Sequence, residues 1–411
     1  MAESNSVLDP ASAKRLMLER ASSLPPIRVK LKSALGLVLA EEVLPLDDQP
    51  PFDNSAMDGY ALRATDTRGA TAERPRRLEV IEVIPAGKMP IKTIAAGQAA
   101  KIMTGAPLPR GADAVMRVEN TFPDGTGVLI KVEAKPGQEI RKAGEDLQQG
   151  RVVLHAGQAL HPGRIGLIAA AGLAEVAVHA RPRIGILITG EELVEPGEPL
   201  PPGKIRNSNG YALYAQILEA GGEPVSYGIV GDDREATKKI LQKALAECQV
   251  VLSTGGVSMG DFDVVEAALA EAGAQILFTK VTQRPGAPLV GAAAGSTLFF
   301  GLPGNPVSSM VCFEVFVRPV IRKMLGRRNL ERPTITGYFA EAFKKPAGLT
   351  YWARVIVEQV AGKNMLRPSA PQGSGVLRSM ALGHGLAEIP ADRTAAGPDD
   401  PVQVRIFAED E

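Results

Sequence analysis

The sequence has few of the residues on which several common kinds of binding site depend. Aromatic residues make up only 4% of the 411 residues, which argues against the base-stacking surfaces of single-stranded nucleic acid binders. Lysine plus arginine and aspartate plus glutamate both number 46, so no net charge attracts nucleic acid or an acidic membrane. Four scattered histidines offer no imidazole cluster and disfavour a zinc site. We therefore expect neither nucleic acid nor a membrane as a partner.

Cysteine is also scarce. The chain has only Cys248 and Cys312, and both lie among apolar residues. Buried small hydrophobic side chains are the simplest interpretation, ahead of a disulfide or a metal site. No apolar run approaches the roughly 20 residues that a membrane-spanning helix needs, and the first residues lack the apolar core of a signal peptide. We expect a soluble protein of a reducing compartment, the cytoplasm.

The chain is too long for one ordinary core, so several domains are expected. Residues 7–22 have a helical apolar pattern with Asp9 near its start, and residues 78–145 alternate apolar and polar positions as short strands do. From Arg183 onward, continuous apolar strands alternate with helices. This order predicts right-handed crossovers and a mostly parallel sheet that is covered on both faces. After Arg332 the alternation returns, which predicts a small separate β domain.

Three of the predicted strands end in polar, glycine-rich loops. Ligands of parallel sheets bind outside the carboxyl ends of the strands, where glycines let backbone N–H groups approach an anion. Ser253, Thr254 and Ser258 can donate hydrogen bonds to phosphate oxygens, and carboxylates beside a phosphate require a hard cation such as Mg²⁺ between them. The loops are TGEEL at residues 189–193, STGGVSMGDFD at residues 253–263 and GLPGNP at residues 301–306.

Each of these features also has a purely structural explanation. TGGVSMG can be an ordinary strand-to-helix turn, and GLPGNP can be a helix start with Pro306 at the first helical position. Asp232 and Asp233 follow a strand and precede a helix, where capping is the commoner role. Lys280 and Arg284 can be a solvated pair. The joint occurrence of these features at strand ends is what favours a ligand site.

Six segments that occur in order over most of the chain carry a family resemblance. They are FDNSAMDGYAL, KIMTGAPLPRGADAVMRVEN, RKAGEDLQQG, ILITGEELVEPGEPL, STGGVSMGDFDVV and FFGLPGNPVSS. Together they resemble the molybdopterin molybdenumtransferase family, which includes the E domains of gephyrin and of its plant counterpart. The resemblance implies an elongated subunit of four domains, usually in a homodimer. It also implies the insertion of molybdate into adenylylated molybdopterin, with release of AMP and assistance from Mg²⁺.

The expected fold class is a multi-domain α/β protein. Its main part is a doubly wound, mostly parallel α/β domain of the molybdopterin-binding kind, with a β-rich N-terminal region and a small C-terminal domain like a β-barrel. The predicted division is residues 1–51 for the N-terminal helical part of a scaffold domain, 52–145 for a small β-rich domain, 146–180 for the return segment of the scaffold domain, 181–328 for the molybdopterin-binding α/β domain and 329–411 for the C-terminal β domain.

The resemblance also implies a set of site residues, to which the hydroxyl and glycine positions of the loops are added. The acidic positions with catalytic roles fall on Asp58, Asp146, Glu192, Asp232 and Asp263. Of these, Asp58 and Asp263 are the candidate Mg²⁺ ligands, whereas Glu192 or Asp146 can instead be a general base. The substrate-binding positions are Thr104, Thr189, Ser253, Gly255, Gly256, Ser258, Lys280, Arg284, Pro303, Gly304, Asn305, Pro306, Arg354 and Ser374.

One departure from the family concerns a Lys-Pro-Gly-Lys-Pro segment, which reads RPGAP at residues 284–288 here. Arg284 keeps the first positive charge but replaces a point charge with a planar fork. Ala287 loses the second charge. Since Lys280 is retained, Lys280 and Arg284 are the candidates for binding molybdate. The departure bears on the affinity and preference for the oxyanion rather than on the reaction class.

Two other functions share some of these features. The related molybdopterin adenylyltransferase has the TGG and GLPGNP elements, but the N-terminal region with DNSAMDGYA argues against it. A gephyrin-like scaffold is the second alternative, kept as an additional role because nothing resembles an appended linker or second catalytic domain. The expected partners are adenylylated molybdopterin, molybdate and a second copy of the chain in a homodimer with a shared active site. Molybdopterin adenylyltransferase and molybdoenzyme chaperones are further candidates.

Overall fold

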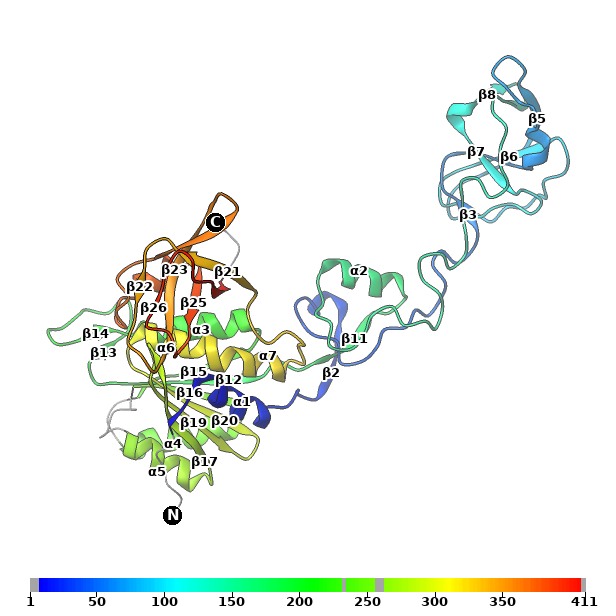
Figure 1. Cartoon of the computed structure of the whole chain (residues 1–411). Helices are drawn as coiled ribbons and strands as arrows, with labels where there is room; N and C mark the ends of the chain where they lie inside the picture. The colour runs from blue at the N-terminus through cyan, green and yellow to red at the C-terminus, as the bar shows by residue number, and fades with distance from the viewer. Residues whose placement is uncertain (1–6, 231–233, 256–261, 408–411) are drawn as a thin grey trace.

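The computed structural model describes residues 7–230, 234–255 and 262–407. They form an elongated molecule (Figure 1), in which an α/β body and a C-terminal β unit lie at one end and a small β domain lies at the other. A narrow connecting segment joins the two ends. Among the helices in these ranges, none has both the length and the apolar character that a membrane crossing needs.

A seven-stranded sheet forms the centre of the α/β body. The four pairs β1–β17, β20–β16, β16–β12 and β12–β15 are parallel, whereas β19 is antiparallel to both of its neighbours. The prediction of a doubly wound, mostly parallel sheet is therefore confirmed. In spatial order the strands are β1 (Val7–Leu8), β17 (Gln275–Val281), β19 (Pro288–Ala294), β20 (Thr297–Leu302), β16 (Val250–Thr254), β12 (Arg183–Thr189) and β15 (Glu223–Val230).

Helices cover both faces of this sheet, which explains why its strands are continuous apolar runs. Successive side chains of a strand point to opposite faces. Thus Ile186 and Ile188 of β12 belong to one buried cluster and Leu187 to another. The first cluster packs against α1 (Pro10–Arg20), α3 (Asn209–Ala220), α6 (Pro306–Cys312), a π-helical turn (Phe313–Val317) and α7 (Arg318–Met324). The second packs against α4 (Arg234–Glu247) and α5 (Phe262–Glu271).

The first helix is shorter than the pattern over residues 7–22 predicts. It begins at Pro10, and the Asp9 side chain accepts a hydrogen bond from the Ser12 N–H at 3.0 Å. Proline is favoured in a first helical turn, and it keeps the preceding residue extended. Val7–Leu8 therefore forms β1 instead, beside β17. Helix α1 packs into the α/β core, whereas our division places residues 1–51 in the scaffold domain; the division itself stays a prediction.

The connecting segment consists of chain that runs outward and chain that returns. Strand β2 (Pro26–Lys30) pairs with β11 (Glu175–His179), and helix α2 (Pro162–Ala170) lies beside them. Leu39, Ile168 and Val178 are fully buried in the small core that these parts share. The outgoing and returning strands thus hold the β domain away from the α/β body. A 3₁₀ turn (Leu31–Ser33) completes this segment.

The β domain at the far end contains a six-stranded sheet. The strands are mostly antiparallel, but β5 and β6 run parallel. The expectation of short strands within residues 78–145 is confirmed. The order is β7 (Ala114–Arg117), β4 (Gly59–Leu62), β6 (Gln98–Ile102), β5 (Arg76–Ile84), β9 (Gly127–Ile130) and β8 (Thr121–Asp124), with β3 (Asn54–Ser55) paired to β10 (Ile140–Arg141) and 3₁₀ turns at Ala64–Thr67 and Val118–Asn120.

The C-terminal unit is a closed five-stranded barrel, as the sequence predicts. Strand β25 pairs with β23 as well as with β27, and this pairing closes the ring and leaves no free edge. The strands are β23 (Thr350–Val360), β24 (Lys363–Pro368), β21 (Thr334–Phe339), β27 (Val402–Ile406) and β25 (Gly385–Ile389), accompanied by β22 (Phe343–Lys344), β26 (Ala395–Ala396) and α8 (Arg378–Ala381). Strand β18 (Gln283–Arg284) of the α/β body pairs with β23.

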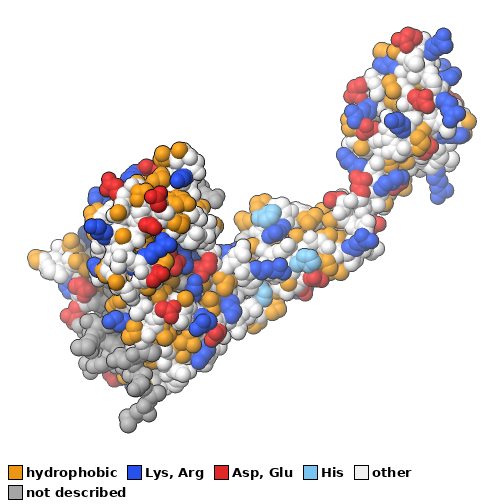
Figure 2. Space-filling model, in the orientation of Figure 1, with side chains coloured by type: hydrophobic (Ala, Val, Ile, Leu, Met, Phe, Trp, Pro, Cys, Tyr) orange, Lys and Arg blue, Asp and Glu red, His pale blue; other side chains and the backbone are white. Residues whose placement is uncertain are grey.

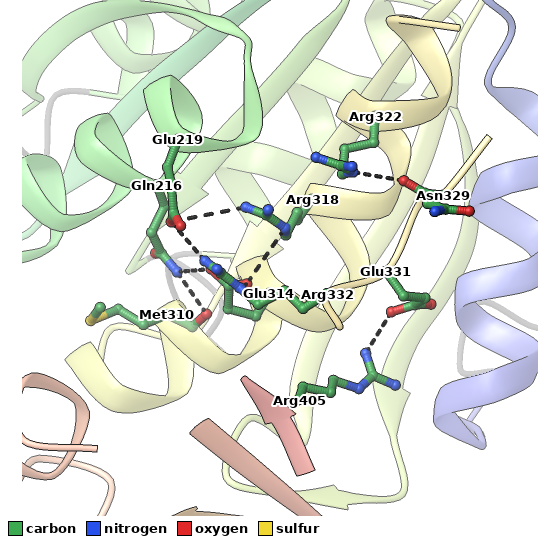
Figure 3. A network of polar contacts seen from close by, with 10 residues as sticks. All are labelled: Gln216, Glu219, Met310, Glu314, Arg318, Arg322, Asn329, Glu331, Arg332 and Arg405. Carbon is green, nitrogen blue, oxygen red and sulfur yellow. Dashed lines mark hydrogen bonds and ion pairs between the residues drawn. The ribbon is translucent and has the colours of Figure 1, made fainter. Parts of the chain in front are cut away.

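A buried ionic network joins the helices of the α/β body to the segment that enters the barrel (Figure 3). Arg332 donates to both oxygens of Glu314, at 2.6 and 3.2 Å, and to Glu219 Oε2 at 2.6 Å. Gln216 Nε2 donates to Glu314 Oε1 at 2.9 Å. The Glu314 side chain is only 3% exposed. Burial of this carboxylate is therefore tolerated because Arg332 is bidentate and Gln216 satisfies a further lone pair.

We expect Glu314→Ala to lower the free energy of unfolding by about 3 to 5 kcal/mol, because it leaves the buried Arg332 without its main partner. Urea denaturation measures this loss. Glu358→Ala is the matched control, because it breaks the exposed Arg367–Glu358 pair, where about 0 to 1 kcal/mol is expected. Equal losses in the two variants would contradict the structural role of the network.

Candidate functional site

The three glycine-rich loops of the α/β body start side by side. In the sheet register, Thr254 of β16 lies between Ile188 of β12 and Leu302 of β20. The Thr189 hydroxyl donates to the Thr254 carbonyl at 3.1 Å and links the first two loops. The residues that connect β20 to α6 are Pro303, Gly304 and Asn305. The structure therefore brings the sequence-predicted loop residues together at one edge of the sheet.

Glycine is required where the second loop begins. Gly255 has a φ of 80°, and a Cβ atom there would lie 2.5 Å from the Thr189 carbonyl oxygen. A Cβ on Gly304 would lie 3.8 Å from the Gly255 Cα. A side chain is thus excluded at Gly255, whereas a Cβ on Gly304 would be in ordinary van der Waals contact, and the two glycines contribute a backbone surface at this edge. Such a surface suits an anion that binds to N–H groups.

Some of the predicted residues are described only in part. Ser253 is 2% exposed, and its hydroxyl has no hydrogen-bond partner within the described ranges. Asp263 lies in α5, but its side chain is outside the described part of the structure. The predicted residues Gly256, Ser258 and Asp232 lie outside the described residues altogether.

The loop after β12 is held by its own contacts. Two short strands, β13 (Leu193–Val194) and β14 (Ile205–Arg206), pair in parallel, and the Ile205 N–H donates to the Glu192 carbonyl at 2.7 Å. The Glu192 carboxylate folds back over Gly190, where a Cβ would lie 2.6 Å from Oε2. Lys204 Nζ donates to the Glu191 carbonyl. The backbone of Glu192 therefore lies beside the end of β12, and a catalytic role for its carboxylate stays a prediction.

Asn209 is a residue that the sequence reasoning missed. It is the first residue of α3, and its Nδ2 donates to the Gly304 carbonyl at 2.8 Å. Its Oδ1 is buried and has no partner among the described residues. In the sequence, an asparagine in the NSNG stretch indicates the start of a helix. The sequence gives no sign of its contact with a loop about 95 residues away. Asn209 thus anchors the GLPGNP loop to α3.

The barrel contributes a loop to the same edge. The Val307 N–H, next to Pro306 at the start of α6, donates to the Ser374 carbonyl at 3.1 Å. Arg354 is completely buried and donates to the Gly373 carbonyl at 3.4 Å and to the Ser379 hydroxyl at 3.2 Å. Burial lowers the pKa of its guanidinium below the ordinary value. Arg354 supports the Ser374 loop from behind, and a direct contact of Arg354 with a ligand stays a prediction.

Lys280 and Arg284 lie where the α/β body meets the barrel. Lys280 is near the end of β17, and Arg284 is in β18, paired with Tyr351 of β23. Both side chains are exposed. Across the described ranges neither cation has a carboxylate within ion-pair distance. The binding of an oxyanion by Lys280 and Arg284 stays a prediction.

Two further predicted residues lie together in the β domain. Asp58 Oδ1 accepts hydrogen bonds from the Thr104 N–H at 2.7 Å and from the Thr104 hydroxyl at 2.8 Å. These bonds, the backbone one first, hold the pKa of Asp58 below its ordinary value. The carboxylate is therefore charged at neutral pH and lies at the surface.

Asp146 lies at the base of the β domain. Its N–H donates to the Gln49 carbonyl at 3.0 Å. It borders an open groove of about 610 Å³. Asn54 also lines this groove, and its buried Oδ1 has no hydrogen-bond partner in the described part of the chain. The lining residues are Gln49, Pro50, Asn54, Arg141, Glu145 and Asp146. The groove is a polar cavity that belongs to the β-domain group of predicted residues.

A single chain does not bring all predicted residues together. Asp58, Thr104 and Asp146 belong to the β domain and its base, whereas the glycine-rich loops belong to the α/β body (Figure 1). Figure 2 shows these two parts as separate masses joined by a narrower one. Within the described ranges, no group of three or more His, Cys, Asp or Glu residues is placed to hold a metal ion. The candidate site is thus two half-sites at opposite ends of one chain.

The fold defines an elongated, multi-domain α/β protein (Figure 1) with a candidate ligand site at the carboxyl edge of a parallel sheet. Three family models match the chain. They are the MoeA N-terminal region (domain I and II) over residues 8–172, a probable molybdopterin binding domain over residues 185–323, and the MoeA C-terminal region (domain IV) over residues 336–407. The chain belongs to the molybdopterin molybdenumtransferase family.

Relatives and solved structures agree with this assignment over nearly the whole chain. Molybdopterin molybdenumtransferase 2 of Mycobacterium tuberculosis is 40% identical over 93% of this chain and 96% of its own length. The molybdopterin molybdenumtransferase of Bacillus subtilis is 37% identical over 93% of this chain and 90% of its own length. A crystal structure of a molybdopterin biosynthesis MoeA protein from Pyrococcus horikoshii has 31% identity and a TM-score of 0.84, and covers 98% of this chain and 100% of its own.

We expect Gly255→Ala to lower the free energy of unfolding by about 1 to 3 kcal/mol more than a glycine-to-alanine change in open space, because its Cβ overlaps the Thr189 backbone. Gly362→Ala is the control, since Gly362 has a φ of 78° and no atom within 4 Å of an added Cβ. Urea denaturation compares the two, and hydrogen exchange should speed up at the ends of β12 and β16 only in Gly255→Ala. Equal effects would mean that the close approach does not matter.

Proposed function

We propose that this protein inserts molybdate into adenylylated molybdopterin and releases AMP. The observation that carries the proposal is the close approach of Gly255 to the Thr189 backbone beside Gly304, at the edge of the sheet where the Ser374 loop of the barrel contacts the start of α6. Relatives that match nearly the whole chain, and that carry the name molybdopterin molybdenumtransferase, support it. The same full-length match disfavours the alternative of a molybdopterin adenylyltransferase.

The surface suits the phosphates of the adenylylated substrate. Phosphate oxygens need several N–H or O–H donors at once, and backbone free of side chains provides them. The start of α3 lies beside the loops through Asn209 and adds the partial positive charge of a helix N-terminus. No protein nucleophile is needed, because the dithiolene of the pterin supplies the sulfurs that bind the metal. The protein's task is therefore to hold two anions close together.

Molybdate is the second anion, and Lys280 and Arg284 are its proposed binding residues. Both are exposed cations, and within the described ranges no carboxylate neutralises them. Arg284 lies in β18, whose partner strand in the barrel also carries the residues that support the Ser374 loop. A dianion between these parts would gain from both positive charges.

Mg²⁺ is proposed as a cofactor that Asp58 and Asp263 help to hold. Asp58 fits this role, because it is a charged, exposed oxygen donor of the kind that hard cations prefer. Bound Mg²⁺ would neutralise phosphate charge as AMP leaves. The described residues, which do not include the Asp263 side chain, hold no group of three such ligands. Substrate oxygens, water and another subunit are the proposed sources of further ligands.

The proposed assembly is a homodimer in which each active site uses both subunits. Its motive is the distance between Asp58 in the β domain and the glycine-rich loops of the same chain (Figure 1). A two-fold axis can place the β domain of one copy against the α/β body of the other. Molybdopterin adenylyltransferase, as the source of the substrate, and molybdoenzyme chaperones are proposed as further partners. The free thiols of Cys248 and Cys312 are compatible with the cytoplasm as the proposed location.

Release of AMP should require both molybdate and a divalent cation, because the substrate's phosphates need charge neutralisation before AMP leaves. The protein is incubated with adenylylated molybdopterin, and AMP is measured by chromatography. We expect near-complete loss of turnover in excess chelator, with recovery on adding Mg²⁺. Turnover that continues in chelator would refute the metal requirement, and AMP release without molybdate would refute its coupling to metal insertion.

Mixed dimers test the shared site. Asp58→Asn and Asp263→Ala proteins, each expected to be inactive, are unfolded together in equal amounts and refolded. If sites are shared, a mixed dimer has one site with both substitutions and one site with none. Random pairing makes about half of the dimers mixed, so activity should return to about a quarter of the wild-type value. Refolded wild type gives the reference, and each variant refolded alone is the control. A mixture that stays inactive would show that each site belongs to one chain.

A further inference from the structure

Gln283 occupies the junction between the α/β body and the barrel. Only 1% of its surface is exposed, and its amide has partners on both sides. The Gln283 Nε2 group donates to the Gly286 carbonyl at 3.1 Å, and Gln283 Oε1 accepts the indole N–H of Trp352 at 2.9 Å. Trp352 belongs to the barrel strand β23, so one buried amide links a loop of the α/β body to the barrel.

The loop on the α/β side contains Arg284 and has little freedom. The Val281 N–H donates to the Ala287 carbonyl at 2.9 Å and closes the loop at its base. Gly286 has a φ of 89°, and a Cβ there would lie 2.5 Å from Cys312 Sγ. The loop therefore packs directly against α6, and the amide of Gln283 donates a hydrogen bond to the Gly286 carbonyl.

On the barrel side the contacts continue to the Ser374 loop. The Trp352 carbonyl accepts a hydrogen bond from Arg354 Nη1 at 3.1 Å, and Arg354 Nη2 donates to the Gly373 carbonyl. A chain of buried polar contacts thus leads from Gly286 through Gln283, Trp352 and Arg354 to the Ser374 loop. It connects the two loops between which the oxyanion is proposed to bind.

We propose that Gln283 is a positioning residue for the oxyanion: together with Trp352 and Arg354, it fixes the spacing between Arg284 and the Ser374 loop. The inference rests on the proposed function and deepens it, because it makes the barrel a determinant of oxyanion affinity. An apolar side chain could fill the same space. An apolar side chain cannot donate to the loop and accept from the barrel at once, as the amide does, and a fully satisfied buried polar contact specifies one arrangement.

Ala287 stands where many members of the family have a lysine, so the position of Arg284 matters more in this protein. With one cation fewer, the attraction for a dianion depends more on where Arg284 is held. The backbone of Arg284 is tied to β23 through the β18 pairing with Tyr351, but its exposed side chain has rotational freedom. Because the loop backbone is already held in place, only the Arg284 side chain loses conformational entropy when the oxyanion binds.

The test replaces Gln283 by methionine, which keeps the length of the side chain but removes its amide hydrogen bonds to Gly286, Cys312 and Trp352. We expect Gln283→Met to raise the molybdate concentration for half-maximal AMP release by at least about fivefold, the equivalent of one hydrogen bond. The concentration of adenylylated molybdopterin for half-maximal rate should stay unchanged. Direct binding of molybdate, measured by calorimetry, should weaken by the same factor.

Gln216→Met is the matched control, because Gln216 is also a buried glutamine, with partners in the ionic network instead of the loop. It should lower the melting temperature without changing the molybdate dependence. Trp352→Phe keeps an aromatic ring but removes the indole N–H together with part of the buried ring, and it should shift the molybdate dependence in the same direction as Gln283→Met. This variant carries the test if Gln283→Met does not fold.

Arg284→Ala distinguishes the failure of the positioning role of Gln283 from the failure of the proposed function. If Arg284→Ala weakens molybdate binding while Gln283→Met and Trp352→Phe do not, the positioning role is refuted and the proposed function stands. If Gln283→Met and Gln216→Met change the molybdate dependence equally, the effect is general destabilisation and the inference fails. If Arg284→Ala has no effect, the oxyanion lies elsewhere and the inference falls with that assignment, whereas molybdate-dependent release of AMP by the wild type would still support the reaction.

Discussion

The close approach of backbones at the carboxyl edge of the central sheet is the constraint on which the rest of the structure depends. Gly255 lies so close to the Thr189 backbone that no side chain fits at position 255, and Gly304 lies beside it, so the ends of β12, β16 and β20 come close together. This spacing needs the parallel register of β12, β16 and β20, which in turn needs helices on both faces of the sheet. The candidate site is thus built on the edge of the central sheet, and a scaffold of packed strands suits preorganised binding.

The barrel is held over this edge by two couplings of different chemistry. The ionic network around Glu314 fixes the segment that enters the barrel, and its energy depends on complete pairing of buried charges. The amide of Gln283 fixes β23 against the Arg284 loop through neutral hydrogen bonds. The network sets where the barrel starts, and the amide sets how its first long strand is oriented. Together they leave the barrel little freedom to move relative to the edge.

The sequence predicts those elements whose patterns depend on local chemistry. Strand β12 is recognisable because burial on both faces leaves no polar side chain in residues 184–188, and α3 ends where Gly221 adopts a φ of 97°. Pairing of β1 with β17 was not predicted, because a strand of two residues has no periodicity and its partner is distant in the sequence. The roles of Asn209 and Gln283 were missed for the same reason. Their contacts are tertiary, and polar residues in loops look alike in sequence.

The burial of Arg354 connects the electrostatics of the barrel to the proposed chemistry. Its guanidinium is completely buried and, within the described ranges, has carbonyl and hydroxyl partners but no carboxylate within ion-pair distance. A buried charge that no counter-charge neutralises is costly, and burial lowers its pKa for this reason. Because the surroundings have a low dielectric constant, its potential reaches further than that of an exposed lysine. An anion beside the Ser374 loop would offset this cost, and this electrostatic gain supports the proposed binding of an oxyanion at the junction of the barrel and the α/β body.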